Sequence, residues 1–332
     1  MDTGSDVILW HNKADKIILS IRGVKKYYPI TSGALRKVNG YIKAVDNIDL
    51  DIAEGKTLGL VGESGCGKST LARLILKLIE PDSGKILFNG TEIQSLSEKE
   101  MKPIRKKMQI IFQDPFGSLN PKMKIGETIE EGLKVLGLDT HDRKEKVKEL
   151  LEMVGMPAVS FEMYPHEFSG GQRQRICIAR ALSVNPLFIV CDEPVSALDV
   201  SIQAQIINLL RELQTKFNIA YLFISHNINL VGYMSDIMAV MYLGQIVEIA
   251  PSEKIFRKPC HPYTKMLLSA VPEPDPQKKI CFISKGEIQN FIDIHYGCKF
   301  QQRCDLYTPE CSKTNIRLKK IDDAHWVRCI CI

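Results

Sequence analysis

The chain reads Gly62-Glu63-Ser64-Gly65-Cys66-Gly67-Lys68-Ser69-Thr70 between a predicted strand, residues 56–61, and a predicted helix, residues 71–79. A glycine-rich run that ends in Lys-Ser, in this strand-to-helix context, is typical of a phosphate-binding loop. Its glycines let backbone N–H groups wrap phosphate oxygens, and the helix N-terminus adds a favourable dipole. We expect these residues, called the phosphate loop below, to hold ATP, with Lys68 at the β- and γ-phosphates and Ser69 at Mg²⁺.

Composition places the chain among ordinary globular proteins. It has 332 residues, of which 45% are hydrophobic and 25% charged, and its formal net charge is +5. The basic run at residues 99–107 is interpreted as a solvated helix face or loop, so we expect no nucleic-acid partner. The N-terminus is acidic and lacks a signal-peptide pattern, and no apolar stretch suits a bilayer. We therefore expect a chain that does not cross a membrane by itself and whose ten cysteines are mostly reduced.

The pattern along the chain is mixed α/β and divides into three predicted regions. A tail (1–16) precedes a large domain (17–258), which contains a helical insertion at about 115–168, and a proline- and cysteine-rich region (259–332) follows. The predicted strands are residues 17–24, 44–52, 56–61, 84–88, 187–191, 220–225 and 237–242. The predicted helices are residues 71–79, 128–136, 143–154, 172–182 and 201–217.

Two acids follow the apolar run at residues 187–191, namely Asp192 and Glu193. A continuous apolar run is typical of a central parallel strand, and such sheets bind ligands at the carboxyl ends of their strands. Asp192 is therefore expected to hold Mg²⁺ through water, and Glu193 to act as the general base for the attacking water.

A second predicted anion-binding helix start follows Phe168, in the run Ser169-Gly170-Gly171-Gln172. Ser169 stands at an N-cap position, and the two glycines leave the backbone donors uncovered. One nucleotide does not need two such sites in one subunit. Two subunits arranged head to tail do, so we expect residues 168–172, the signature loop, to close over ATP held by a partner.

Together these motifs resemble the ATP-binding-cassette (ABC) nucleotide-binding subunits over residues 17–255. The resemblance implies a P-loop cassette with a RecA-like core, an antiparallel β subdomain and the helical insertion. It also implies that Gln113 senses Mg²⁺ and the attacking water, that Asp199 lies at the dimer seam and that His226 contacts the γ-phosphate. Tyr28 resembles the residue that stacks on adenine, and the adjacent Tyr27 remains an alternative.

Longer stretches are similar to the ATPases of oligopeptide and dipeptide importers. They are residues 111–121 (Ile-Phe-Gln-Asp-Pro-Phe-Gly-Ser-Leu-Asn-Pro), 164–172, 191–205 and 261–264 (His-Pro-Tyr-Thr). The insert at 28–41 resembles the F-type rather than the D-type ATPase of such a pair. The resemblance implies three kinds of partner chain: a D-type ATPase as heterodimer partner, two transmembrane permease subunits, and an extracytoplasmic substrate-binding protein. It also implies that the chain acts at the cytoplasmic face of the inner membrane.

Other classes of protein use the same ATPase motifs. Import of another solute, such as a nickel complex, uses the same motifs and stays open. A chromosome-maintenance ATPase would need a long coiled coil between Gln113 and Ser169. A translation-type ATPase would need a second cassette, and an exporter would usually have membrane spans fused to the cassette. The sequence has none of these features.

Four cysteines near the C-terminus form the last predicted site: Cys298, Cys304, Cys311 and Cys329. No Cys-x₂-Cys pair typical of zinc sites is present among them. Their resemblance to the peptide-importer tail implies a four-iron four-sulfur (4Fe–4S) cluster with a structural or regulatory role. Zinc, or free thiols, remain alternatives, and Cys331 is an alternative ligand to Cys329.

Overall fold

The computed structural model describes residues 15–32, 37–270 and 296–332, and the predicted tail at 1–16 lies almost wholly outside this part. The described residues belong to two compact units. Unit 1 contains residues 15–53, 57–94 and 225–332, and unit 2 contains residues 54–56 and 95–224, apart from the gaps just given. Unit 1 thus joins the phosphate loop and the C-terminal region, whereas the boundary predicted at residue 258 stays a prediction.

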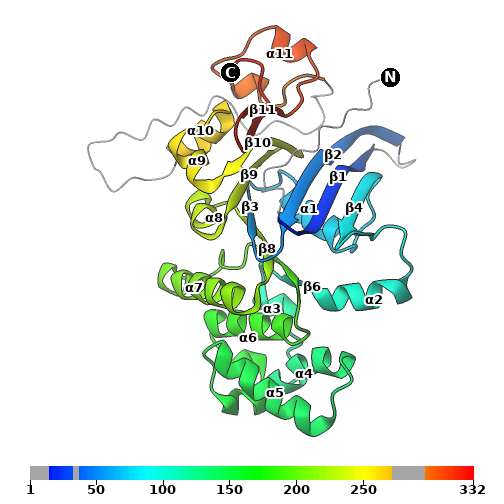
Figure 1. Cartoon of the computed structure of the whole chain (residues 1–332), viewed down its shortest axis with the longest axis vertical. Helices are drawn as coiled ribbons and strands as arrows, with labels where there is room; N and C mark the ends of the chain where they lie inside the picture. Colours follow the sequence, from blue (N-terminus) through cyan, green and yellow to red (C-terminus); the bar gives the residue numbers. More distant parts are fainter. Residues whose placement is uncertain (1–14, 33–36, 271–295) are drawn as a thin grey trace. The chain divides into compact units, whose positions relative to one another are not determined.

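Unit 1 contains a four-stranded antiparallel sheet in the order β2-β1-β4-β5 (Figure 1). The strands predicted at 17–24 and 44–52 are confirmed but run much further, since the β1–β2 pairing continues from Ile17↔Ala53 to Ser32↔Lys37. The insert at 28–41 therefore prolongs a hairpin. The strand bounds are β1 Ile17–Ser32, β2 Lys37–Ala53, β4 Ser83–Phe88 and β5 Thr91–Glu92.

A second set of strands in unit 1 carries the phosphate loop. Strand β3 is buried throughout and pairs in parallel with β9, and β10 continues the set antiparallel to β9. The C-terminal strand β12 pairs with β10 and then with β11, so the cysteine-rich region is built onto the edge of this sheet. The bounds are β3 Thr57–Val61, β9 Ile237–Tyr242, β10 Gln245–Pro251, β11 Lys319–Asp322 and β12 His325–Val327.

A buried polar junction helps to seat β12. Both Glu248 carboxylate oxygens accept hydrogen bonds, from the backbone N–H of Cys260 at 2.8 Å and of His261 at 2.9 Å. The Nε2 of His325 lies 2.7 Å from Glu248 Oε1. Because the buried carboxylate is fully partnered, the junction links β10, β12 and the start of α10 without needing a ligand.

The helices of unit 1 are short. Helix α1 begins at Lys68, three residues before the predicted start, and ends at Ile75, because Lys77 takes a left-handed conformation (φ 51°) and reverses the chain. The bounds are α1 Lys68–Ile75, α8 Ile228–Met234, α9 Ser252–Arg257, α10 Pro262–Ser269 and α11 Glu310–Lys313, with a 3-10 helix at Gln301–Arg303.

Unit 2 contains parallel strands in the order β8-β7-β6 and the helical insertion. The basic run forms α2, which a Ser97–Glu100 capping box begins, and its lysines Lys99, Lys102 and Lys107 are exposed, as the solvated-face interpretation expects. The strand bounds are β6 Met108–Ile111, β7 Phe188–Asp192 and β8 Ala220–Ser225. The helix bounds are α2 Glu98–Lys107, α3 Pro115–Ser118, α4 Ile125–Val135, α5 Thr140–Met153, α6 Gly170–Leu182 and α7 Val200–Phe217, with 3-10 helices at Ala158–Glu162 and Pro165–Glu167.

The two helices predicted in the insertion are confirmed, and both begin earlier than their apolar periodicity indicated. Helix α4 buries Ile125, Ile129 and Leu133, which are spaced four residues apart on one face. Helix α5 begins at Thr140 because the Asp139 side chain accepts a hydrogen bond from the Asp142 N–H and caps it. Within the described residues, every helix is too short or too polar to traverse a lipid bilayer.

Candidate nucleotide site

The phosphate loop needs glycine for two separate reasons. Gly65 and Gly67 have positive φ angles of 78° and 111°, which disfavour any residue with a Cβ. Gly62 and Gly67 also approach neighbouring backbone: a Cβ would collide with the carbonyl oxygen of Met241 at Gly62 and with that of Ala44 at Gly67. The loop conformation is therefore fixed by its sequence and by the strands beside it.

Lys68 lies across the phosphate loop rather than in solvent. It is buried, and its Nζ donates to the backbone oxygens of Gly62 at 2.7 Å and Glu63 at 3.0 Å. Burial raises the pKa of the adjacent Cys66 thiol, which therefore packs as a neutral group. Ser64 and Gly65 are exposed at the rim, and Ser69 and Thr70 are half-buried in the first turn of α1. A cation is thus held where loop-bound phosphates would meet it.

In unit 2 the structure joins two residues predicted from separate motifs. Asp192 ends β7, and Glu193 follows in a left-handed conformation with φ 50°. The Glu193 N–H donates to Ile224 O at 3.0 Å, which fixes this turn. Gln113 Nε2 then donates to Glu193 Oε2 at 3.1 Å. The carboxylate oxygens of Asp192 and the side-chain amide oxygen of Gln113 are hard donors of the kind that Mg²⁺ prefers.

The signature loop forms the N-terminus of α6 as predicted. Ser169 Oγ accepts from Gln172 N–H at 3.4 Å, and Gln172 Oε1 accepts from Ser169 N–H at 3.0 Å, which together make a capping box. Ser169 is exposed, whereas Phe168 is buried. A Cβ on Gly171 would collide with Ile202 of α7, so the close approach of α6 and α7 requires this glycine.

Helix α6 also holds the segment that follows Gln113. The buried Arg173 guanidinium lies 3.5 Å from the centre of the Phe116 ring, and its Nε donates to Pro165 O at 2.6 Å. Arg180 donates to Ser118 O at the end of α3. The signature helix and the segment after Gln113 are therefore tied to each other inside unit 2.

The remaining predicted residues lie at element ends or edges. Asp199 is exposed at the N-cap of α7, and His226 is exposed directly after β8. Asn227, which follows His226, caps α8 through its side-chain oxygen. Tyr27 and Tyr28 differ: the Tyr27 hydroxyl donates to Asp46 Oδ1 at 2.6 Å, whereas the Tyr28 ring is 38% exposed.

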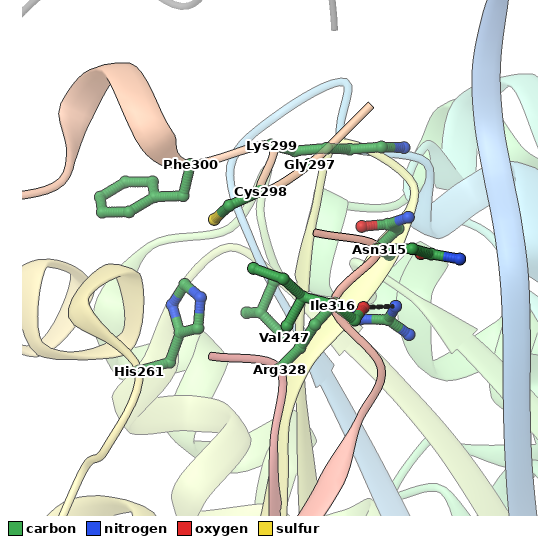
Figure 2. A pocket seen from close by; sticks show the side chains of 10 residues that line it. Val247, His261, Gly297, Cys298, Lys299, Phe300, Asn315, Ile316 and Arg328 are labelled. Carbon is green, nitrogen blue, oxygen red and sulfur yellow. Dashed lines mark hydrogen bonds between the residues drawn. The ribbon is translucent and has the colours of Figure 1, made fainter. Parts of the chain in front are cut away.

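Several thiols lie near Cys298 in the C-terminal region. The pKa of Cys298 is raised to about 12, mainly by burial and to a smaller extent by the nearby thiols of Cys304, Cys311 and Cys329. Cys298 N–H donates to Cys311 O at 2.7 Å, and Cys311 Sγ lies 3.7 Å from the Sγ of Cys331, the predicted alternative ligand. Cys298 and His261 also line one small pocket (Figure 2). Each of the nine cysteines in the described part is free of disulfides.

Sequence reasoning missed a set of contacts from the C-terminal region to the phosphate loop. The Tyr263 hydroxyl accepts a hydrogen bond from Glu63 N–H at 2.9 Å, and Arg303 pairs with the Glu63 carboxylate at 2.9 Å. Tyr263 belongs to the His-Pro-Tyr-Thr stretch already noted in the sequence, but the sequence does not indicate that its hydroxyl contacts the phosphate loop. Arg303 precedes Cys304 in the stretch that resembles the peptide-importer tail, but that resemblance does not indicate a partner for its guanidinium.

Comparison with known proteins identifies the family. Residues 45–196 match the family described as ABC transporter, and residues 247–311 match the one described as oligopeptide/dipeptide transporter, C-terminal region. The oligopeptide transport ATP-binding protein AppF of Bacillus subtilis is 47% identical over 317 residues, which cover 94% of this chain and 96% of AppF. The chain belongs to the ABC ATPases of the oligopeptide/dipeptide transporter family.

Further relatives agree with this family membership. OppF of Bacillus subtilis, an oligopeptide transport ATP-binding protein, is 51% identical to this ATPase over 262 residues, which cover 78% of this chain and 84% of OppF. The dimeric ABC cassette MJ0796, solved in a post-hydrolysis state with ADP and phosphate, aligns with a TM-score of 0.63 at 26% identity, covering 70% of this chain and 98% of that one. The family resemblance and cassette fold inferred from the motifs are confirmed, and the ATPase hydrolyses ATP.

Proposed function

We propose that this ATPase powers peptide import by hydrolysing ATP·Mg²⁺ at sites shared with a second ATPase subunit. The hydrogen bond from Gln113 to Glu193 carries the proposal, since it joins a magnesium-sensing amide to the expected general base at the end of β7. The relatives AppF and OppF are named for oligopeptide transport, which supports peptides as the substrate class.

Each phosphate contact is assigned to a residue type that suits it. Lys68 neutralises the β- and γ-phosphates, Ser69 and Asp192 bind Mg²⁺ directly or through water, and His226 contacts the γ-phosphate. Tyr28 stacks on adenine, an assignment that its exposed ring supports, because the Tyr27 hydroxyl is already bonded to Asp46.

The partner of the nucleotide site is a second cassette. The N-cap Ser169 is exposed, and the adjacent Gly170 and Gly171 offer backbone donors outside the capping box to an anion on another chain. Asp199, exposed at the start of α7, lies at the seam. We assign the partner as the D-type ATPase of a heterodimer, with this chain as the F-type subunit.

The assembly places this ATPase at the cytoplasmic face of the inner membrane, bound to two permease subunits that receive peptides from an extracytoplasmic binding protein. The test is affinity purification from native membranes, followed by identification of every bound chain and peptide uptake by the reconstituted complex. Recovery of two polytopic proteins and ATP-dependent peptide uptake is expected. Uptake of nickel complexes or another solute in place of peptides would contradict the substrate class.

The C-terminal cysteines are proposed to hold a 4Fe–4S cluster through Cys298, Cys304, Cys311 and Cys329, with Cys331 as an alternative donor. The backbone hydrogen bond from Cys298 to Cys311 and the 3.7 Å between the Cys311 and Cys331 sulfur atoms support ligation in one place. Thiolates are the ligands that iron–sulfur clusters require, and a bound cluster would cross-link this irregular segment. The part of these residues would be to supply soft sulfur donors from separate segments of the chain.

A further inference from the structure

The Glu63 residue of the phosphate loop is a point of attachment for the rest of unit 1. Its backbone oxygen accepts a hydrogen bond from Lys68 Nζ at 3.0 Å and from Cys66 N–H at 3.2 Å. Its N–H donates to the Tyr263 hydroxyl at 2.9 Å. The orientation of the Lys68 ammonium therefore depends on where the Glu63 peptide is held.

The Glu63 side chain is held by a residue 240 positions later in the chain. Arg303 Nη1 donates to Glu63 Oε2 and Nη2 to Oε1, each at 2.9 Å, in a two-pronged pair. The Arg303 side chain is only 7% exposed. Such a pair fixes the carboxylate in direction as well as position, because both donors belong to one rigid plane.

Arg303 is itself oriented before it reaches Glu63. Its guanidinium lies 5.9 Å from the centre of the Tyr242 ring and 5.7 Å from that of Phe300, and Met266 Sδ is 3.5 Å from Nη2. The rings of Tyr242, Tyr263 and Phe300 pack against one another. The arginine therefore reaches the phosphate loop from a preorganised aromatic cluster.

A second cation from the same segment supports the loop indirectly. Lys299 Nζ donates to Leu243 O at 2.7 Å and pairs with Asp46 at 2.8 Å. The next residue, Gly244, donates its N–H to Cys66 O within the phosphate loop at 2.8 Å. Figure 2 shows the Lys299 and Phe300 side chains pointing to opposite sides of the chain. Of these consecutive residues, Lys299 therefore contacts the turn that contains Leu243, and Phe300 packs in the aromatic cluster.

We infer that Arg303 is a positioning residue for ATP binding, which acts through Glu63. It neutralises a carboxylate that would otherwise repel nucleotide phosphates, and it fixes the loop that orients Lys68. The Glu63 carboxylate and the nucleotide phosphates carry charges of the same sign, so an uncompensated carboxylate in the phosphate loop weakens the binding of an anion. The C-terminal region thus completes the nucleotide site of this chain.

The test measures ATP·Mg²⁺ affinity of the purified full-length chain by equilibrium binding. Arg303→Met is expected to raise the Kd about tenfold, which corresponds to about 1.4 kcal/mol. In a Glu63→Gln background, where no carboxylate needs neutralising, the same substitution is expected to change the Kd less than about threefold. The matched control is Arg105→Met, which removes an equally two-pronged but exposed pair with Glu98 on α2.

Further measurements separate positioning from general support of the fold. In the assembled ATPase, the loss is expected in KM for ATP and not in kcat at saturating ATP, because the attacking water is assigned to Glu193 and not to Arg303 or Glu63. An unchanged Kd in Arg303→Met, an equal loss in the Glu63→Gln background, or a loss of kcat with unchanged KM would each overturn the inference. Should Arg303→Met fail to fold, Arg303→Lys replaces it. A lysine contacts the carboxylate as a single point charge, so about threefold weaker binding is expected, and a native Kd would overturn the inference.

Discussion

The Gln113 side-chain amide donates a hydrogen bond to the Glu193 carboxylate, with 3.1 Å between Nε2 and Oε2. The two residues are 80 positions apart, yet their motifs end on neighbouring parallel strands, β6 and β7. The amide therefore orients the oxygen that is assigned to the attacking water, and it joins the base to the segment that begins α3.

The first prediction concerns this base. Glu193→Gln is expected to bind ATP·Mg²⁺ with nearly native affinity and to hydrolyse it at least about 100-fold more slowly, since the water loses its proton acceptor. Phosphate release in the assembled complex and nucleotide binding by the isolated chain measure the two effects. Glu162→Gln is a suitable control, because Glu162 is an exposed carboxylate paired with Lys124. Native turnover in Glu193→Gln would show that another group is the base.

A second prediction tests the shared site. The background is a heterodimer in which Glu193→Gln abolishes hydrolysis at the nucleotide site of this chain. Adding Ser169→Arg to this chain is expected to reduce turnover at the partner's nucleotide site by about tenfold or more. The reason is that the arginine side chain would occupy the N-terminus of α6, where the partner's γ-phosphate is expected to bind. Ser97→Arg on α2 is the matched control, since Ser97 is also an exposed serine in a capping box. Full turnover at the partner's site would rule out action between chains.

The third prediction concerns the C-terminal cysteines. Anaerobically purified protein is expected to be brown and to contain iron and acid-labile sulfide, and Cys311→Ser is expected to lower both by more than half. Cys177→Ser, at a buried free cysteine in α6, should leave them unchanged. ATP binding is expected to survive loss of the cluster so long as the Arg303–Glu63 pair persists. A colourless protein with stoichiometric zinc, or with no metal, would contradict the cluster.

The last prediction concerns acid stability. Burial lowers the pKa of His261 from 6.5 to about 4, and the positive charge of Arg328 also lowers it. The neutral ring accepts the Tyr263 N–H through Nδ1 and caps α10. Between pH 6.5 and 4 the unfolded chain binds a proton at this histidine that the folded chain does not bind. The free energy of unfolding is therefore expected to fall as the pH falls from 6.5 to 4. Below pH 4 both states are protonated, so His261 causes no further loss of stability.

His261→Asn tests this origin of the pH dependence. Asparagine is a good N-cap without a titrating group, so Tm plotted against pH should become flatter between pH 6.5 and 4. His141→Asn, at an exposed histidine in α5, controls for the substitution itself. An unaltered slope in His261→Asn would assign the acid sensitivity to other groups.

The sequence predicted best what is encoded locally. The phosphate loop, the acid pair at the end of β7 and the signature loop each occupy nine or fewer consecutive residues, so their residue types and spacing reveal the motif and its place on a strand end or helix start. Element ends were less predictable, because they depend on caps such as Asp139 and on reversals such as Lys77, which the apolar periodicity does not report.

The contacts that sequence reasoning missed are those of long range. Nothing near Arg303 indicates that its guanidinium reaches Glu63, which lies 240 positions earlier, since residues 95–224 of unit 2 lie between them in the sequence. The cysteine region lies far in the sequence from every catalytic motif. In the fold, β12 pairs with β10 and brings this region beside the phosphate loop.

The pairing of β12 with β10 also affects whether copies of this chain can associate through their sheet edges. Strand β10 is buried along most of its length, and without β12 its backbone would form a bare apolar edge open to another strand. The edge that the full chain exposes instead is β11, which is four residues long, fully exposed and carries Lys319 and Lys320. Short edge strands that carry lysines resist the addition of another strand. Strands β11 and β12 therefore protect the sheet against aggregation. A chain that is truncated before β11 should precipitate even where it still binds ATP.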